Sequence, residues 1–271
     1  MECKIEDITI HYESIGKGCP LLLVHGWPSD HRHIQNDFEP LFKDRENWWR
    51  IYPDLPGMGK TRAADWITHQ DQMLDILLKF MDSIAPGERF VIAGSSYGAY
   101  LARGIVHHRL DQLDGLAITV PVVKREPTHL PEHRVIKEDA AFLAALRPEE
   151  QNLMNMLTAQ SMETLENFRK NFVPAFASAD YDFLEQLKKN YWFSFDVDLL
   201  PQPFPAPALI LSGRFDHWCG YLDAFQLLDQ YPRATFAVLD RAGHGLGSEQ
   251  KSLFQALAGE WLDRVEEYQK R

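Results

Sequence analysis

The sequence of 271 residues contains few cysteines and no long apolar segment. The three cysteines, Cys3, Cys19 and Cys219, are odd in number and form no C-x-x-C pair. This pattern argues against a disulfide framework and against a thiolate zinc site, and it favours a reducing compartment. No apolar run reaches the roughly 18 residues that span a bilayer, and the N-terminus lacks the basic and apolar segments of a signal peptide. We therefore expect a cytoplasmic protein that does not contact a membrane.

Positive charge is also scarce, because 28 Lys and Arg stand against 39 Asp and Glu and give a formal net charge of −11. A surface with this charge repels the phosphates of nucleic acid, so we expect no nucleic-acid partner. The composition, with 45% hydrophobic and 25% charged residues, is ordinary for a globular protein and excludes global disorder. A chain of this length fits one or two domains with a sizeable core.

Apolar runs and helical patterns alternate along most of the chain. Residues 7–15 alternate apolar and polar side chains, as a half-exposed strand does. Continuous apolar runs follow at 20–26, 91–93, 116–120, 208–211 and, more loosely, 235–239. Such runs are typical of strands that are buried on both faces of a parallel sheet. Segments 71–84 and 249–267 place apolar residues at helical spacing, so the alternation predicts an α/β domain with a mostly parallel sheet.

The segment 122–205 departs from this alternation. It contains helix-like patterns, such as 138–146 and 162–172, but no strand-like apolar run. Pro121 precedes it, and a group of prolines between 201 and 207 stiffens the return to the sheet. We therefore predict a core domain of residues 1–121 and 206–271 with an inserted helical subdomain of residues 122–205.

A glycine-rich motif, Gly94-Ser95-Ser96-Tyr97-Gly98, separates a predicted strand at 89–93 from a predicted helix. A serine in such a sharp strand-to-helix turn needs glycine two positions before it and two after it, because side chains there would collide with neighbouring backbone. Ser96 has this spacing and Ser95 does not. The motif therefore predicts Ser96 as a nucleophile.

A serine hydroxyl becomes a useful nucleophile when a base takes its proton and an acid orients that base. Asp216 follows the predicted strand at 208–211, and His244 follows the one at 235–239. Each of the three side chains thus lies beyond the carboxyl end of a different parallel strand, in the order Ser, Asp, His. We predict a Ser96–His244–Asp216 triad, with Asp223 and Asp240 as the competing candidates for the acid.

Two backbone N–H groups are predicted to stabilise negative charge on the substrate oxygen. One belongs to Tyr97, which follows the nucleophile, and the other belongs to Trp27 in the turn His25-Gly26-Trp27-Pro28. The side chains expected in the substrate pocket are those of His25, Trp27, Ser95, Trp192 and Trp218. Trp192 belongs to an aromatic group at 191–195 that could equally form the core of the insert.

No metal site and no cofactor site is predicted. His31 and His33 could chelate a metal, but no carboxylate or further histidine follows them at the spacing of a hydrolytic metal site. We interpret them as polar residues at the surface or at the rim of the site.

Five segments together resemble the α/β-hydrolase superfamily over the whole chain. They are HGWP at 25–28, DLPGMGKT at 54–61, GSSYG at 94–98, GRFD at 213–216 and AGH at 242–244. The resemblance implies a twisted, mostly parallel sheet of about eight strands with helices on both faces. It also implies a helical cap, inserted after the sixth strand, that covers the site, and an activity that needs no cofactor.

The nucleophile narrows this resemblance to the serine branch. HGWP is similar to the corresponding motif of epoxide hydrolases and haloalkane dehalogenases, but those enzymes use an aspartate where this chain has Ser96. Proline iminopeptidases show H-G-G-P-G, from which Trp27 and Ser29 depart. The branch that fits is the esterase-like and lactonase-like one.

We therefore expect an enzyme that hydrolyses a carboxylic ester or lactone of a small or medium acyl group through an acyl-enzyme intermediate. Because His244 must be neutral to act as a base, activity should fall as the pH drops through about 6.5, the usual pKa of histidine. The expected partner is a small-molecule substrate, and the protein is expected to be a monomer or a homodimer.

Three alternatives stay open: a carbon–carbon bond hydrolase, an amidase or peptidase, and a ligand-binding protein without turnover. A positively charged cap pocket would favour carbon–carbon hydrolysis of an acidic substrate. The basic residues of the insert that could supply that charge are Lys124, Arg125, Arg134, Arg147 and Arg169.

Overall fold

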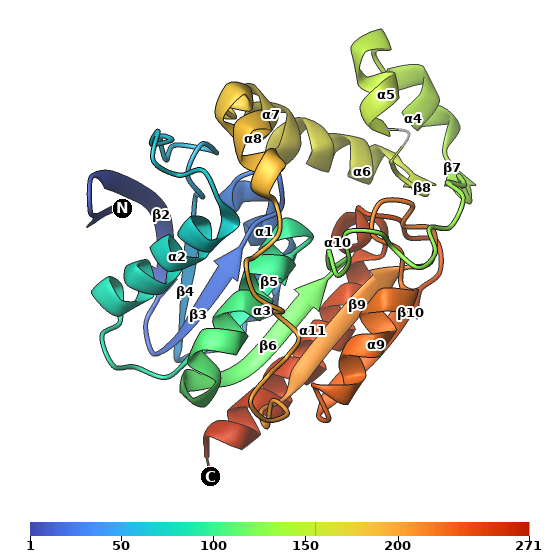
Figure 1. The fold of residues 1–271 in the computed structure, drawn as a ribbon. Coiled ribbons are helices and arrows are strands. Elements are labelled where there is room, and N and C mark those ends of the chain that lie inside the picture. The colour runs from blue at the N-terminus through green and yellow to red at the C-terminus, as the bar shows by residue number, and fades with distance from the viewer. Residues whose placement is uncertain (155, 271) are drawn as a thin grey trace.

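The computed structural model describes residues 1–154 and 156–270, and an eight-stranded sheet forms its centre (Figure 1). The strands of this sheet are β1 (Glu2–Ile5), β2 (Ile8–Gly16), β3 (Cys19–Val24), β4 (Trp48–Pro53), β5 (Phe90–Ser95), β6 (Leu113–Thr119), β9 (Ala208–Gly213) and β10 (Ala234–Leu239). They lie in the order β1-β2-β4-β3-β5-β6-β9-β10. β2 is antiparallel to β1 and β4, and the other neighbouring pairs are parallel, which confirms the predicted mostly parallel sheet.

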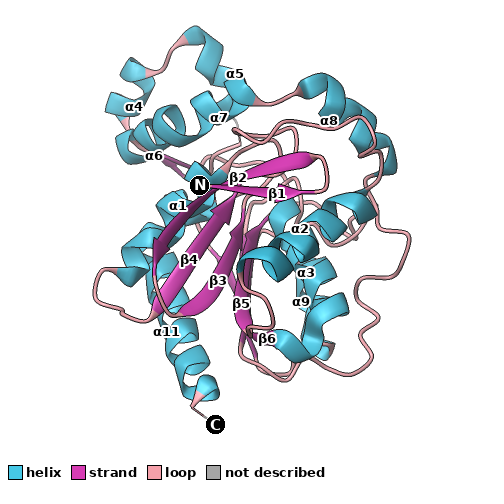
Figure 2. Ribbon diagram, turned by 90° about the vertical axis from the view of Figure 1, so that its left-hand side faces the viewer, coloured by secondary structure: helices cyan, strands magenta, loops and turns pink. Residues whose placement is uncertain are grey.

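Helices cover both faces of the sheet (Figures 1 and 2). Those of the core are α1 (His31–Phe38), α2 (Gln70–Ile84), α3 (Tyr97–Arg109), α9 (Leu222–Gln226), α10 (Leu246–Glu249) and α11 (Lys251–Gln269). α2, α3 and α9 contribute to the apolar cluster on one face, with Met73 and Leu101 among its members. α1 and α11 contribute to the cluster on the other face, which includes Phe38 and Trp261.

The buried apolar strands separate these two clusters. In β3, Leu22 and Val24 join the cluster of α2 and α3, whereas Leu21 and Leu23 join the cluster of α1 and α11. All four side chains are completely buried. Successive side chains of a strand point to opposite faces, so a strand covered on both sides must be apolar at every position. This confirms the reading of the apolar runs as strands of a doubly covered sheet.

The apolar runs do not mark β1 and β4. β1 is a short edge strand, and its pattern of exposed and buried residues carries little signal. β4 has Arg50 in the middle of the sequence WWRIYP. The Arg50 guanidinium donates to both carboxylate oxygens of Glu39, at 3.1 and 3.0 Å, and this pairing allows a charged side chain in a buried strand. The charge interrupts the apolar run that would have identified the strand.

A mainly helical insert lies between β6 and β9, beyond the carboxyl ends of the parallel strands (Figure 1). Its helices and strands are β7 (Lys137–Glu138), α4 (Ala140–Ala145), α5 (Gln151–Met154), β8 (Ala159–Gln160), α6 (Met162–Asn167), α7 (Val173–Ser178) and α8 (Tyr181–Leu187). The insert also contains two short strands, β7 and β8, which pair in parallel and which the search for strand-like apolar runs did not indicate. Each contains two residues, too few for an apolar pattern to show.

The insert has a small apolar core of its own, built from Phe142, Leu165 and Phe168 among others. A π-helical turn at Phe168–Phe172 joins α6 to α7.

Within residues 1–154 and 156–270, the structure has no helix with both the length and the apolar character that crossing a membrane requires.

The chain that returns from the insert is fixed to α3, the helix that follows the glycine-rich motif. The Tyr100 hydroxyl accepts the Phe193 N–H at 2.6 Å. Arg103, which is 0% exposed, donates to the Asp198 carboxylate at 2.9 Å and to the Val122 carbonyl oxygen at 2.7 Å. Because Val122 and Asp198 lie at the two ends of the insert, one guanidinium holds both of its connections.

Replacing Arg103 should therefore destabilise the fold. Breaking a buried ion pair leaves the partner uncompensated, so R103M should lower the free energy of unfolding by about 3 kcal/mol. Arg109 on the same helix forms a more exposed pair with Asp82, and R109M should cost less than about 1 kcal/mol. Urea denaturation of the wild type and both variants measures this difference. Equal losses in the two variants would show that the Arg103 contacts do not anchor the insert.

Candidate active site

Ser96 lies in the sharp turn between β5 and α3. Its φ of 55° is in the left-handed region, which a residue other than glycine rarely adopts. The Ser96 N–H donates to the Thr119 carbonyl oxygen of β6 at 2.9 Å and holds the turn against the neighbouring strand. A Cβ atom at Gly98 would come within 2.1 Å of the Val24 carbonyl oxygen, and one at Gly94 within 2.3 Å of the Gly98 carbonyl oxygen. Only glycine fits at these two positions.

Side chains from three loops form a chain of hydrogen bonds. His244 Nε2 lies 3.0 Å from Ser96 Oγ, and His244 Nδ1 lies 3.0 Å from Asp216 Oδ2. The Asp216 carboxylate is 0% exposed, and its second oxygen accepts the N–H groups of Trp218 at 3.0 Å and Cys219 at 3.1 Å. These donors fix the carboxylate, and the carboxylate orients the imidazole toward Ser96.

The two other aspartates that the sequence offered as the acid lie elsewhere. Asp223 accepts the Thr128 N–H at 2.8 Å and lies 2.8 Å from the Lys124 ammonium. Asp240 is exposed, and its ion pair is with Arg241 at 4.0 Å. Asp216 is thus the carboxylate that contacts the histidine.

Burial and the neighbouring charge shift the pKa of His244 in opposite directions. Burial disfavours the protonated imidazole, but the Asp216 carboxylate beside Nδ1 outweighs it and holds the pKa of His244 well above the usual 6.5. Cys219 also lies beside the ring, and burial raises the pKa of its thiol. The imidazole therefore binds a proton readily, as a group that takes one from Ser96 must.

The two residues whose N–H groups the sequence singled out are close to Ser96: Tyr97 follows it in the chain, and Trp27 lines the same pocket. Tyr97 is the first residue of α3, where a backbone N–H has no partner within the helix. The turn at Gly26 packs so closely that a Cβ atom there would lie 3.3 Å from Ser96 Cβ, and Trp27 is the next residue of that turn. Among the residues that the structure describes, neither N–H donates to a protein acceptor.

A largely apolar pocket with a cavity volume of about 220 Å³ opens onto Ser96 and His244. Core and insert both contribute to its wall. The lining residues are Gly26, Trp27, Pro28, Ser29, His33, Ser96, Met156, Phe172, Phe176, Tyr181, Trp218 and His244. The pocket thus lies where the insert covers the carboxyl ends of the strands.

The sequence model of the alpha/beta hydrolase family matches residues 21–254 of this chain. The chain belongs to the alpha/beta hydrolase family. It is a hydrolase, with the sheet and the helices on both faces that the sequence led us to expect.

Several proteins are similar to this hydrolase. A crystal structure of an alpha/beta superfamily hydrolase from Oenococcus oeni superposes with a TM-score of 0.87 at 28% identity and covers 98% of this chain and 99% of that one. The AB hydrolase superfamily protein YisY of Bacillus subtilis is 23% identical over 94% of this chain and 96% of its own length. A pimeloyl-[acyl-carrier protein] methyl ester esterase of Legionella pneumophila is 34% identical over 95 residues, or 35% of each chain.

Two of the residues predicted for the pocket line it, and three do not. Trp27 and Trp218 form part of its wall. His25 is buried behind the turn, where its Nε2 accepts the Leu55 N–H at 3.0 Å. Ser95 is buried in β5. Because successive side chains of a strand point to opposite faces, its side chain does not point to the same side as that of Ser96. Trp192 packs edge-on against Tyr100, which places this aromatic group in the core between insert and α3.

Sequence reasoning missed His33 as a pocket residue of this hydrolase. Its ring packs against Phe172 at 4.5 Å between centroids, and its Nδ1 lies 3.4 Å from Ser29 Oγ. Burial, with the nearby rings of His25 and His244, lowers the pKa of His33 to about 3, so the side chain is neutral and offers hydrogen bonds rather than charge. His33 lies in the first turn of α1, the helix that follows β3, and this place near the carboxyl end of a buried parallel strand was the signal that could have found it.

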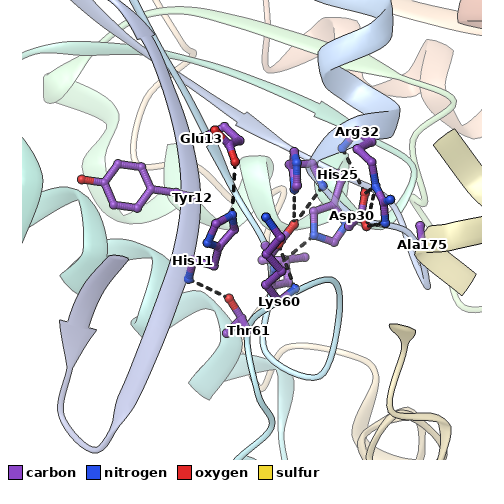
Figure 3. Close-up of polar contacts among 12 residues, drawn as sticks. His11, Tyr12, Glu13, His25, Asp30, Arg32, Lys60, Thr61 and Ala175 are labelled. Carbon is purple, nitrogen blue, oxygen red and sulfur yellow. Dashed lines mark hydrogen bonds and ion pairs between the residues drawn. The ribbon is translucent and has the colours of Figure 1, made fainter. Parts of the chain in front are cut away.

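A second polar network lies around Asp54, near His25 and Asp30 (Figure 3). One Asp54 oxygen accepts the backbone N–H of His31 at 3.0 Å and lies 2.7 Å from its Nδ1, and the other accepts the Lys60 N–H at 2.9 Å. Burial opposes a charge on Asp54, but its contacts with His31 outweigh it and lower the pKa to about 2. The network ties the segment 54–61 to the loop after β3.

Two groups of side chains in the described part of the chain have the ligand types of a metal site. The candidate ligand atoms of His11, His31 and Asp54 lie within 4.8 Å of one another, and so do those of Asp216, Cys219 and His244. In both groups N–H donors already occupy the carboxylate, so hydrogen bonding accounts for each arrangement.

The close packing at Gly98 predicts a large effect of one methyl group. G98A forces the new Cβ atom against the Val24 carbonyl oxygen, and overpacking of this kind costs about 1–3 kcal/mol or more. Gly259 in α11 is the matched control, because its nearest neighbour would lie 3.9 Å from an added Cβ atom, and G259A should be neutral or stabilising. Urea unfolding of the two variants tests this. A G98A protein as stable as G259A would contradict the steric account of the turn.

Proposed function

We propose that this hydrolase cleaves carboxylic esters or lactones of small, uncharged acyl groups through an acyl-enzyme on Ser96. The observation that carries the proposal is the chain of hydrogen bonds from Ser96 Oγ through His244 to the buried Asp216, at the wall of an apolar pocket. Such a chain supplies an activated nucleophile, its base and the group that orients the base. The partial similarity to a methyl ester esterase supports the choice of ester substrates.

In the proposed mechanism, Ser96 Oγ attacks the acyl carbon while His244 Nε2 takes the hydroxyl proton. The negative charge that develops on the carbonyl oxygen is stabilised by the backbone N–H groups of Trp27 and Tyr97. His244 then returns the proton to the departing alcohol, which leaves the acyl group on Ser96. A water molecule, deprotonated by the same imidazole, attacks the acyl carbon, the bond to Ser96 Oγ breaks, and His244 returns the proton to the serine as the acid leaves.

The size of the pocket limits the acyl group. A cavity of about 220 Å³ holds roughly seven groups the size of a water molecule or a methylene, at about 30 Å³ each. Phe172, Phe176 and Trp218 supply most of the apolar wall, whereas Ser29 and His33 offer neutral hydrogen-bonding atoms. This pocket fits an acyl chain of about two to six carbons with at most one polar group.

The charge of the pocket argues against carbon–carbon hydrolysis of an acidic substrate. Among the described residues that line it there is no Lys or Arg. Lys124 pairs with Asp223, and Arg169 pairs with Glu150 within the insert. None of the five basic residues of the insert that the sequence offered lines the pocket, so they do not provide a counter-ion there.

Hydrolysis of p-nitrophenyl acyl esters tests both the nucleophile and the pocket. We expect the wild type to prefer acyl chains of about two to six carbons over chains of about twelve. S96A should lose at least about 10³-fold in kcat, because it removes the hydroxyl that His244 deprotonates. Ser95, which does not line the pocket, provides the control, and S95A should keep most of the activity. Turnover that persists in S96A would refute the assignment of the nucleophile.

The pH profile tests the base and the acid. A protonated His244 cannot accept the Ser96 proton, so kcat/KM should fall with decreasing pH, at a midpoint above 6.5 because Asp216 raises the pKa of His244. In D216N the charge that raises this pKa is gone, so the midpoint should move to lower pH and kcat should fall by about 10⁴-fold.

D240N, which removes an exposed carboxylate of the same region, is the control for this measurement and should keep the wild-type profile. A D216N profile identical to that of the wild type, or a shift reproduced by D240N, would assign the orienting acid to another residue.

A further inference from the structure

Glu249, the last residue of α10, binds two parts of the chain at once. One carboxylate oxygen accepts the Gly243 N–H at 2.7 Å. The other accepts the Ala159 N–H at 2.9 Å and also the N–H of Thr158. Gly243 precedes His244, whereas Thr158 and Ala159 belong to the insert, so a single side chain joins the histidine loop to the insert.

The two segments that Glu249 joins are in direct contact. A Cβ atom at Gly243 would lie 3.0 Å from Thr158 Oγ1 and 3.1 Å from the Met156 carbonyl oxygen. Met156 lines the pocket, beside His244. The contact between Gly243 and the insert therefore influences two positions at once: that of the insert above the pocket and that of the His244 imidazole.

Backbone N–H groups make this carboxylate difficult to replace. Burial raises the pKa of Glu249 to about 7, and the nearby Asp216 carboxylate adds to this effect, whereas the N–H groups of Ala159, Gly243 and Thr158 lower it. The negative charge is thus costly at this place and is stabilised by its donors. Without the carboxylate, three N–H groups would lose their acceptor, and leaving such groups unsatisfied costs more than a hydrogen bond contributes.

We propose that Glu249 is a positioning residue that couples the insert to the catalytic histidine: by holding Gly243 and the Thr158–Ala159 segment together, it keeps His244 over Ser96 while the insert covers the pocket. This inference rests on the proposed function, since it takes Ser96 and His244 as the reacting pair. Glu249 itself contacts neither the nucleophile nor the pocket.

The rate at which a fluorophosphonate labels Ser96 tests the proposal, because this reagent reports how well His244 activates the serine without requiring the natural substrate. E249Q keeps the shape of the side chain but turns an NH₂ group toward at least one N–H donor. We expect labelling to slow by about tenfold or more, since a displacement of about 1 Å can reduce reactivity by about 100-fold.

Glu163 offers the matched control. It also links the insert to the core, through an ion pair with Lys251 at 2.9 Å, but this pair is exposed and joins no residue of 241–245 to the insert. E163Q should label at the wild-type rate. Thermal unfolding is measured for each protein, and all rates are compared well below the lowest Tm. If E249Q does not fold, E249D, which keeps the charge but shortens the reach, takes its place.

Hydrogen exchange provides the readout that a loss of stability alone would not produce. In E249Q, peptides covering 156–160 and 241–245 should both lose protection, while peptides of β5 and β6 keep theirs. A folded Glu249 variant that labels as fast as the wild type, or that loses protection in only one of the two segments, would overturn the coupling. A wild-type protein that the reagent does not label would overturn the proposed function first, and the coupling with it.

Discussion

The backbone around Ser96 is packed so closely that it determines the rest of the site. At Gly98 the chain approaches β3, and at Gly94 it approaches the first turn of α3. This contact fixes a left-handed conformation at Ser96, whose hydroxyl lies 3.0 Å from His244 Nε2. It also brings the turn at Gly26 against the serine, so the nucleophile and the two candidate N–H donors come from one packed unit. The wall of the pocket, the base His244 and the insert all lie around Ser96.

The rest of the site is held by carboxylates that accept backbone N–H groups. Asp216 is fixed by the N–H groups of its own loop, and Asp54 holds the loop after β3 to the segment 54–61. Glu249 holds the histidine loop and the insert together. Loops contribute flexible backbone, and a buried carboxylate with several donors removes that freedom. The same arrangement thus holds three of the loops around the site.

Sequence patterns located the sheet and the candidate triad because both depend on local rules. Strands covered on both faces must be apolar throughout, and the turn at Ser96 requires glycine at fixed positions. The patterns failed where a side chain from another segment pairs with a polar residue or covers it, because the local sequence does not show that partner. Arg50 interrupts the apolar run of β4, and the buried strand tolerates this charge because the Glu39 carboxylate pairs with it. His33 was interpreted as a polar residue at the surface or at the rim of the site, but the insert residue Phe172 packs against its ring and makes it part of the pocket wall.

The sequence by itself determined the fold class, the insert between two halves of the sheet, and the candidate residues Ser96, Asp216 and His244, since each follows from spacing along the chain. Only the tertiary structure decided which side chains form the pocket, that Trp192 packs in the core, and that Glu249 binds both the insert and the histidine loop. These features arise from contacts between segments far apart in sequence. The physical reason is that a local pattern records whether a side chain is buried, but not what buries it.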